Sequence, residues 1–276
     1  MSGLVVVLGT LAGALGLALG SFLNVVVHRV PAGLSVVTPA SACPACGHGI
    51  RRRDNVPVVS WLVLRARCRD CGTGISARYP LVEALTAVTF VLVALRFAPV
   101  AADTVRSLVS AVLVLVAFAV LMGASIALAA IDLDTARLPN AITYPTGAVL
   151  AVLLSGAAII AGQPGDLLRA GVGASVLGGA YLALALAVPG GMGLGDVKLA
   201  VVLGFALAYL GWGPLAVGAF AAFVLGGTFA VGLLVVRGGG RRTGIPFGPW
   251  MLAGAWVGVF SGAPLWTSYL SVIGLG

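Results

Sequence analysis

Charged residues are scarce in this chain. They make up 9% of its 276 residues, whereas roughly a quarter of the residues in soluble domains are charged. Hydrophobic residues account for 60%, and the mean hydropathy is +1.13. This balance excludes an ordinary soluble domain. Several separate apolar stretches each approach the roughly 20 residues that a helix needs to cross a bilayer. The composition therefore predicts an all-α polytopic membrane protein.

Histidine and cysteine are also few, and their positions restrict the chemistry. The only histidines are His28 and His48, and no serine, cysteine and histidine set for nucleophilic catalysis is evident. All four cysteines fall between positions 43 and 71, as two Cys-x-x-Cys pairs. That grouping is more typical of a metal site than of a disulfide framework.

The basic residues lie in the loops and predict the orientation. The formal net charge is +8, and the only sizeable polar segment, 28–80, carries eight of the sixteen basic residues. By the positive-inside rule this segment is cytoplasmic, which places the amino terminus outside. Because the charge is confined to loops, membrane orientation explains it better than nucleic-acid binding, and we expect no nucleic-acid partner.

The apolar segments predict eight spans. The first, within residues 1–27, lacks a basic leader region and is too long for a typical signal peptide, so we expect a retained anchor. Its spaced glycines, Gly9, Gly13, Gly16 and Gly20, suit close helix packing. The others are expected at about 81–98, 107–131, 141–162, 168–188, 197–210, 215–236 and 247–272. We therefore divide the chain into a first transmembrane helix (1–27), a cytoplasmic zinc-binding insert (28–80) and a membrane-embedded domain (81–276).

The charges outside the insert test this topology. Eight spans place thirteen of the sixteen basic residues inside and only Arg96, Arg106 and Arg169 outside. The same topology places Asp132 and Asp196 on the cytoplasmic face, although they are far apart in the sequence.

The cysteine pairs predict a closed metal site. Cys43 and Cys46 are separated from Cys68 and Cys71 by 21 residues, and a glycine follows each pair. Four thiolates suit a tetrahedral Zn²⁺ and leave no open position, so the metal would be structural. A disulfide and a redox Cys-x-x-Cys are the alternatives, and His48 is a further candidate ligand. The arginines between the pairs could contact lipid headgroups or a substrate.

Three aspartates, Asp132, Asp134 and Asp196, lie where long apolar runs meet polar loops. Asp132 ends an apolar run, and Asp196 begins another after Gly-x-Gly. A charged side chain at a membrane boundary costs free energy unless it is hydrated, paired with another charge or required for function. Asp132 and Asp134 would not share a helix face, and we expect Asp132 to be the buried one. Glu83, at the start of a span, suits a helix cap, and a functional role for it stays open.

A pair formed by Asp132 and Asp196 could act as an aspartic dyad. Two carboxylates that share a site cannot both ionise cheaply, so one keeps a proton. The charged member would deprotonate a water, and the protonated member would polarise the scissile carbonyl. The alternative is structural: each aspartate caps a helix or pairs with Arg137 or Lys198.

The motifs together resemble the type IV prepilin leader peptidases, which are aspartic proteases of the bacterial inner membrane. The resemblance covers most of the chain. It rests on Gly-Ser-Phe-Leu-Asn-Val at 20–25, the two cysteine pairs around 54–62, Arg-Tyr-Pro-Leu-Val-Glu at 78–83, Ile-Asp-Leu-Asp at 131–134 with Leu138-Pro139, and Gly-Met-Gly-Leu-Gly-Asp-Val-Lys at 191–198.

The resemblance implies that Asp132 and Asp196 are the catalytic pair. The resemblance also implies that the protein removes the basic leader of prepilins or pseudopilins by cleavage just after a glycine. This cleavage would take place at the cytoplasmic face of the inner membrane. It also implies, for many members, methylation of the new amino terminus with S-adenosylmethionine. One departure is Asn140, where the family often has aspartate.

Two other functions remain as alternatives. An ion- or proton-coupled transporter would use boundary carboxylates, but it should show half-to-half repeats or broken midplane helices, which the sequence lacks. A zinc-bearing scaffold would make the aspartate pair incidental. The oligomeric state stays open.

Overall fold

The computed structural model describes residues 2–99, 102–188, 192–237 and 246–274. Within these ranges the chain is helical, and the only β-pairing consists of two isolated bridges. Eight long helices coincide with the eight predicted spans: α1 (Ser2–Arg29), α3 (Arg78–Phe97), α4 (Val105–Thr135), α5 (Asn140–Ala161), α6 (Pro164–Ala187), α7 (Leu194–Leu210), α8 (Trp212–Arg237) and α9 (Gly248–Val272). The predicted fold class is confirmed.

The length and hydropathy of the helices identify a multi-pass membrane protein. Six of the described helices, namely α1, α3, α4, α5, α6 and α8, are long and apolar enough to cross a membrane. Helix α7 has 17 residues, the lower limit for a span. Its neighbours α5, α6, α8 and α9 surround it.

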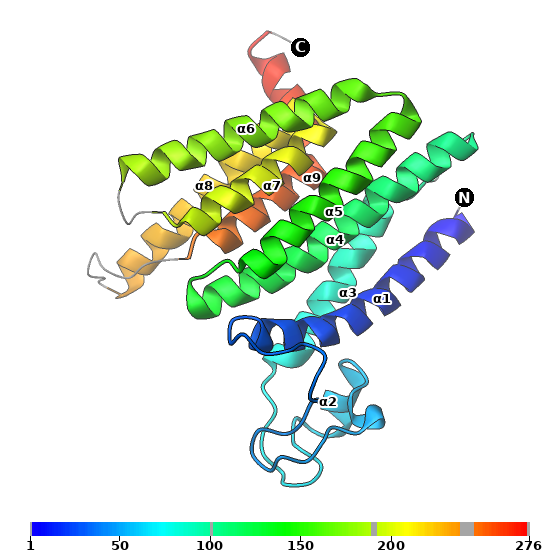
Figure 1. The fold of residues 1–276 in the computed structure, drawn as a ribbon, viewed down its shortest axis with the longest axis vertical. Helices are drawn as coiled ribbons and strands as arrows, with labels where there is room; N and C mark the ends of the chain where they lie inside the picture. Colours follow the sequence, from blue (N-terminus) through cyan, green and yellow to red (C-terminus); the bar gives the residue numbers. More distant parts are fainter. Residues whose placement is uncertain (1, 100–101, 189–191, 238–245, 275–276) are drawn as a thin grey trace.

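Helices α4 and α7 occupy the middle of the bundle (Figure 1). Helix α4 packs against α1, α3, α5 and α9, and both α5 and α9 also contact α7. The two helices that carry the candidate aspartates therefore share two neighbours. This arrangement lets residues about sixty positions apart meet at one end of the bundle.

Glycines allow the close helix contacts that the sequence predicted for the first span. A Cβ added at Gly16 would lie 2.6 Å from the Ala87 Cα, and one added at Gly20 would lie 2.7 Å from the Glu83 Cα. Real side chains do not approach backbone atoms so closely, so α1 and α3 can pack at this distance only with glycine at these positions.

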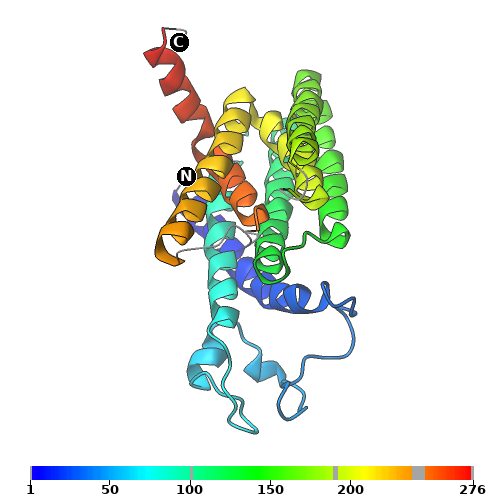
Figure 2. The same ribbon diagram turned by 90° about the vertical axis from the view of Figure 1, so that its left-hand side faces the viewer.

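The polar insert lies beyond one end of the bundle, below α1 and α3 (Figures 1 and 2). It contains a single 3₁₀ turn, η1 (Arg52–Asp54), and one short helix, α2 (Val59–Val63). With so little regular structure, a segment of this size cannot bury a core of its own. Contacts between side chains, described below, therefore hold it together.

Candidate active site and metal centre

Asp132 lies in the last turn of α4 and is only 4% exposed. Its Oδ2 accepts a hydrogen bond of 3.1 Å from the backbone N–H of Gly248, the first residue of α9. The donor comes from a residue 116 positions away. A buried carboxylate needs such a partner, and here the amino-terminal end of another helix supplies it.

Asp134 lies on the same helix but faces solvent. Because α4 continues to Thr135, residues two positions apart point in different directions, and the prediction that Asp132 is the buried member is confirmed. The Asp134 carboxylate forms a 2.7 Å ion pair with Arg78, at the start of α3. Asp134 therefore links two helix ends.

Asp196 is the third residue of α7 and is partly buried. Its Oδ2 accepts a 3.0 Å hydrogen bond from the backbone N–H of Gly193, the residue that caps the helix. The capping role considered for this residue is thus present. The bond engages one of the two carboxylate oxygens and leaves acceptor capacity on the other.

The fold brings Asp132, in the last turn of α4, and Asp196, in the first turn of α7, to the same end of the bundle. Leu138 connects their surroundings. Its side chain lies 3.1 Å from the position that a Cβ would take at Gly195, and 3.1 Å from the corresponding position at Gly248. Gly195 precedes Asp196 in the sequence, and Gly248 donates to Asp132. Both glycines therefore pack against the same leucine.

The alternative of ion pairing for the two aspartates is not observed. Among the described residues, neither Asp132 nor Asp196 forms a salt bridge. Lys198 instead donates a 3.1 Å hydrogen bond to Asn140 and lies 5.5 Å from the centre of the Tyr144 ring. Gly190 and Gly191 of the predicted motif, and Arg241 and Arg242, lie outside the described residues.

Sequence reasoning missed Gly248. A Cβ added there would lie 2.6 Å from the Asp132 Oδ2, so only glycine fits. The local signal is Pro246-Phe247-Gly248-Pro249, a helix start flanked by prolines, which does not indicate which distant side chain the glycine meets. The Arg78–Asp134 pair was missed for the same reason.

The four cysteines form one cluster in the insert. Their sulfur atoms all lie within 4.8 Å of one another, and the Cys43 and Cys71 sulfurs are 3.8 Å apart. Four sulfurs about 2.3 Å from a tetrahedral Zn²⁺ would be about 3.8 Å apart. All four thiols are free, so the disulfide alternative is not observed. The donor set and its spacing fit a closed tetrahedral metal site.

The two Cys-x-x-Cys turns share one pattern of backbone hydrogen bonds and dihedral angles, and equivalent residues are 25 positions apart. Gly47 N–H donates to the Cys43 carbonyl and Gly72 N–H to the Cys68 carbonyl, each at 2.9 Å. Both glycines have φ of +73°, which side chains rarely adopt. His48 follows the first turn but is not part of the sulfur cluster.

Ion pairs join the second Cys-x-x-Cys turn to the segment around η1. Arg69 donates to both carboxylate oxygens of Asp54, and these charge-assisted bonds lower the pKa of Asp54. Arg51 pairs with Asp70 at 2.8 Å.

Glu83 attaches the insert to the bundle. It is 8% exposed, and its Oε2 accepts a 2.7 Å hydrogen bond from the backbone N–H of Val58. Val58 has φ of +59°, an unfavourable conformation for a β-branched residue, and this bond helps to hold it. Glu83 therefore anchors a loop of the insert and does not simply cap its own helix.

Within the described residues, long apolar helices with two carboxylates at one end, and an insert whose four cysteines could hold a metal ion, define an integral membrane protein with an appended four-cysteine module. Comparison with protein families identifies it more closely. Residues 14–97 match the bacterial peptidase A24 N-terminal domain, and residues 119–231 match the type IV leader peptidase family. The chain belongs to the type IV leader peptidase family.

Curated relatives agree along nearly the whole chain. A prepilin leader peptidase/N-methyltransferase of Aeromonas salmonicida (strain A449) is 36% identical over 93% of this chain and 92% of its own length. One of Pseudomonas putida with the same name is 37% identical over 96% and 94%. No solved structure matches.

Proposed function

We propose that this protein is a membrane aspartic endopeptidase that removes the basic leader from type IV prepilins or pseudopilins and then N-methylates the new amino terminus. The observation that supports the proposal is the position of Asp132 on α4 and Asp196 on α7 at one end of the bundle, next to glycines that contact the same residue, Leu138. The names of the relatives, prepilin leader peptidase/N-methyltransferase, support both activities.

In the proposed hydrolysis, Asp132 and Asp196 share one proton and hold a water between them. The ionised carboxylate takes a proton from the water as its oxygen bonds to the scissile carbonyl carbon. The protonated carboxylate donates to the carbonyl oxygen. Collapse of the tetrahedral intermediate breaks the C–N bond, and the amine leaves with a proton from the dyad. Backbone N–H groups of Gly248 and Gly193 orient the carboxylates throughout.

The arrangement suits a substrate with a cytoplasmic leader and an apolar helix. We place the protein in the bacterial inner membrane with the insert and the dyad on the cytoplasmic side, because the insert carries half of the basic residues. The scissile bond of such a substrate lies at the membrane boundary, the level to which the distribution of basic residues assigns both aspartates. Residues 28–80 form the metal module, and 81–276 form the peptidase domain that follows the first helix (1–27).

The metal that we assign to Cys43, Cys46, Cys68 and Cys71 is a structural Zn²⁺. Four sulfur ligands leave no position for water, so the ion supplies folding energy to the insert and takes no part in peptide hydrolysis. Methylation requires S-adenosylmethionine as the methyl donor.

The test is cleavage of a prepilin with its leader intact by purified Asp132→Asn and Asp196→Asn variants. We expect both to lose cleavage, while the Asp134→Asn control keeps most of it, because Asp134 is exposed and paired with Arg78. Wild-type cleavage by either dyad variant would refute the assignment. If the wild type leaves the prepilin uncut but moves protons across vesicles, the transporter alternative is correct.

A further inference from the structure

The short helix α2 carries an apolar face that lies open to its surroundings. Val59, Leu62 and Val63 are 54%, 61% and 70% exposed, and spacings of three and four residues place them on one side of the helix. Val56, just before the helix, is 46% exposed. Ser60 is buried on the opposite side, where its hydroxyl bonds backbone groups of the insert. We call the four exposed residues the α2 face.

The α2 face lies beside the membrane-spanning part of the bundle, although most of the insert lies beyond its end. Val58, directly before α2, donates a 2.7 Å hydrogen bond to Glu83. Glu83 lies five residues after the start of α3, which is about 7.5 Å along the helix at 1.5 Å per residue. Helices α1 and α3 are both long and apolar enough to span a membrane. The bond to Glu83 therefore holds the start of α2 at a level inside these spans.

The contact between α3 and α1 gives the same depth. A Cβ added at Gly20 of α1 would lie 2.7 Å from the Glu83 Cα, so the two residues are at one level. Gly20 lies nine residues before Arg29, the last residue of α1, or about 13.5 Å along the helix. Amphipathic segments at a membrane surface bury their apolar side about 5 to 10 Å below the headgroups. The level of α2 matches such a position.

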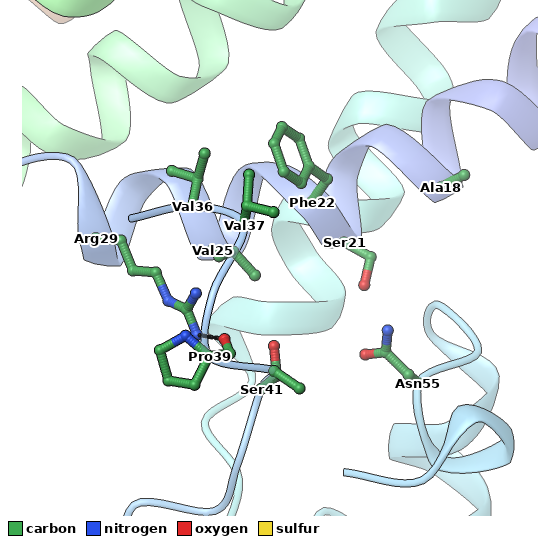
Figure 3. A pocket seen from close by; sticks show the side chains of 11 residues that line it. Ala18, Ser21, Phe22, Val25, Arg29, Val36, Val37, Pro39, Ser41 and Asn55 are labelled. Atoms are coloured by element: carbon green, nitrogen blue, oxygen red, sulfur yellow. Dashed lines mark hydrogen bonds between the residues drawn. The ribbon is translucent and has the colours of Figure 1, made fainter. Parts of the chain in front are cut away.

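A cavity of about 290 Å³ at the start of the same segment agrees with this level. The cavity lies between the carboxyl-terminal half of α1 and the segment 36–41, and Asn55 lines it opposite Ala18 and Ser21 of α1 (Figure 3). Ser21 lies eight residues before the end of α1. The residue that leads into the α2 face thus also lies beside the interior of a spanning helix.

Unpaired positive charge flanks the α2 face in the sequence. Four exposed arginines lie on its two sides: Arg52, Arg53, Arg65 and Arg67. Among the described residues, none of the four forms a salt bridge. The only carboxylates of the insert, Asp54 and Asp70, pair with other arginines. An apolar face between uncompensated arginines matches the boundary of a bilayer, where acyl chains adjoin anionic headgroups.

We propose that the α2 face inserts into the lipid leaflet beside α1 and α3, and that the four flanking arginines bind anionic phospholipid headgroups. Charge disfavours the other occupants. The leader of a prepilin is basic, and a second copy of this chain would bring four more arginines to the same surface, so both are repelled. The contact keeps the four-cysteine module next to the membrane and does not depend on the aspartate dyad.

Quenching by brominated lipid tests the position of the α2 face in the full-length protein. The protein is placed in nanodiscs of phosphatidylcholine and phosphatidylglycerol that carry bromine in the acyl chains near the headgroup. Leu62→Trp adds one indole to the face, and Val63→Trp gives an independent second reading. His48→Trp is the matched control, because His48 is exposed in the insert but lies outside the α2 face.

After subtraction of the wild-type emission, we expect most of the fluorescence added by Leu62→Trp and Val63→Trp to be quenched, and little of that added by His48→Trp. Equal quenching of the control and the two variants overturns the assignment to this face. Absence of quenching in both variants also overturns it, because water or a second copy of the chain then covers the face.

Spin-labelled lipids test the role of the arginines. We expect the wild type to retain labelled phosphatidylglycerol more strongly than labelled phosphatidylcholine. Glutamine at Arg52, Arg53, Arg65 and Arg67 should reduce this preference about fivefold or more, since each arginine near an anionic surface contributes at least that factor. Lysine at the same positions keeps the charge and should keep the preference. An unchanged preference in the glutamine variant overturns the headgroup contact.

Discussion

Replacing Gly248 with alanine tests whether the start of α9 positions Asp132. The added Cβ would lie 2.6 Å from the Asp132 Oδ2 and 3.1 Å from the Leu138 Cδ2. Since real Cβ contacts under 3.0 Å essentially never occur, the carboxylate must move away. The movement lengthens or breaks the 3.1 Å hydrogen bond from the Gly248 N–H.

The expected loss follows from that bond. A hydrogen bond to a charged group contributes about 1.5 to 3 kcal/mol, and a factor of ten in rate corresponds to about 1.4 kcal/mol. Gly248→Ala should therefore lower kcat/KM for prepilin cleavage by about 10-fold to 150-fold. Most of the loss should appear in kcat, because the carboxylate acts in the chemical step.

Two alanine substitutions separate positioning from general damage. Gly227, on α8, has no atom within 4 Å of an added Cβ, so Gly227→Ala should leave activity and stability unchanged. Gly258, on α9 ten residues beyond Gly248, would crowd the Pro214 carbonyl, so Gly258→Ala should lower stability while the folded fraction retains kcat/KM. If Gly248→Ala cleaves within about threefold of Gly227→Ala, the positioning of Asp132 by α9 is refuted.

Three further predictions concern the insert. Serine at Cys43, Cys46, Cys68 and Cys71 should remove zinc measured by elemental analysis and expose the insert to protease, whereas stoichiometric zinc in that variant would exclude the site. Glu83→Ala should destabilise the docking of the insert by about 1.5 to 3 kcal/mol, because it leaves the Val58 N–H without its charged acceptor; equal proteolysis rates of the insert in variant and wild type would contradict this. The pKa of Asp54 is lowered on folding, so its contribution is present above its unfolded pKa of about 3.9 and is lost as pH falls through the folded value. The melting temperature of Asp54→Asn should therefore lie below that of the wild type at neutral pH, and the gap should close in acid.

The sequence determines the parts of this protein that depend on local patterns. Hydropathy marks the long helices, because a helix that crosses a bilayer must cover its thickness with its own residues. Arginine placement predicts their orientation. The spacing of four cysteines predicts the sulfur cluster, since each turn of the cluster is local. The expectation that Asp132 is buried and Asp134 is not follows equally from helical geometry.

Only the tertiary structure decides which distant groups meet. Gly248 donates to Asp132, Arg78 pairs with Asp134, and Glu83 holds the Val58 loop because helices pack against one another in one arrangement. A glycine or an arginine in the sequence carries no information about a partner 56 or 116 positions away. The cavity between the carboxyl-terminal half of α1 and the segment 36–41 is likewise formed by parts of the chain that become neighbours only when the insert folds against the bundle.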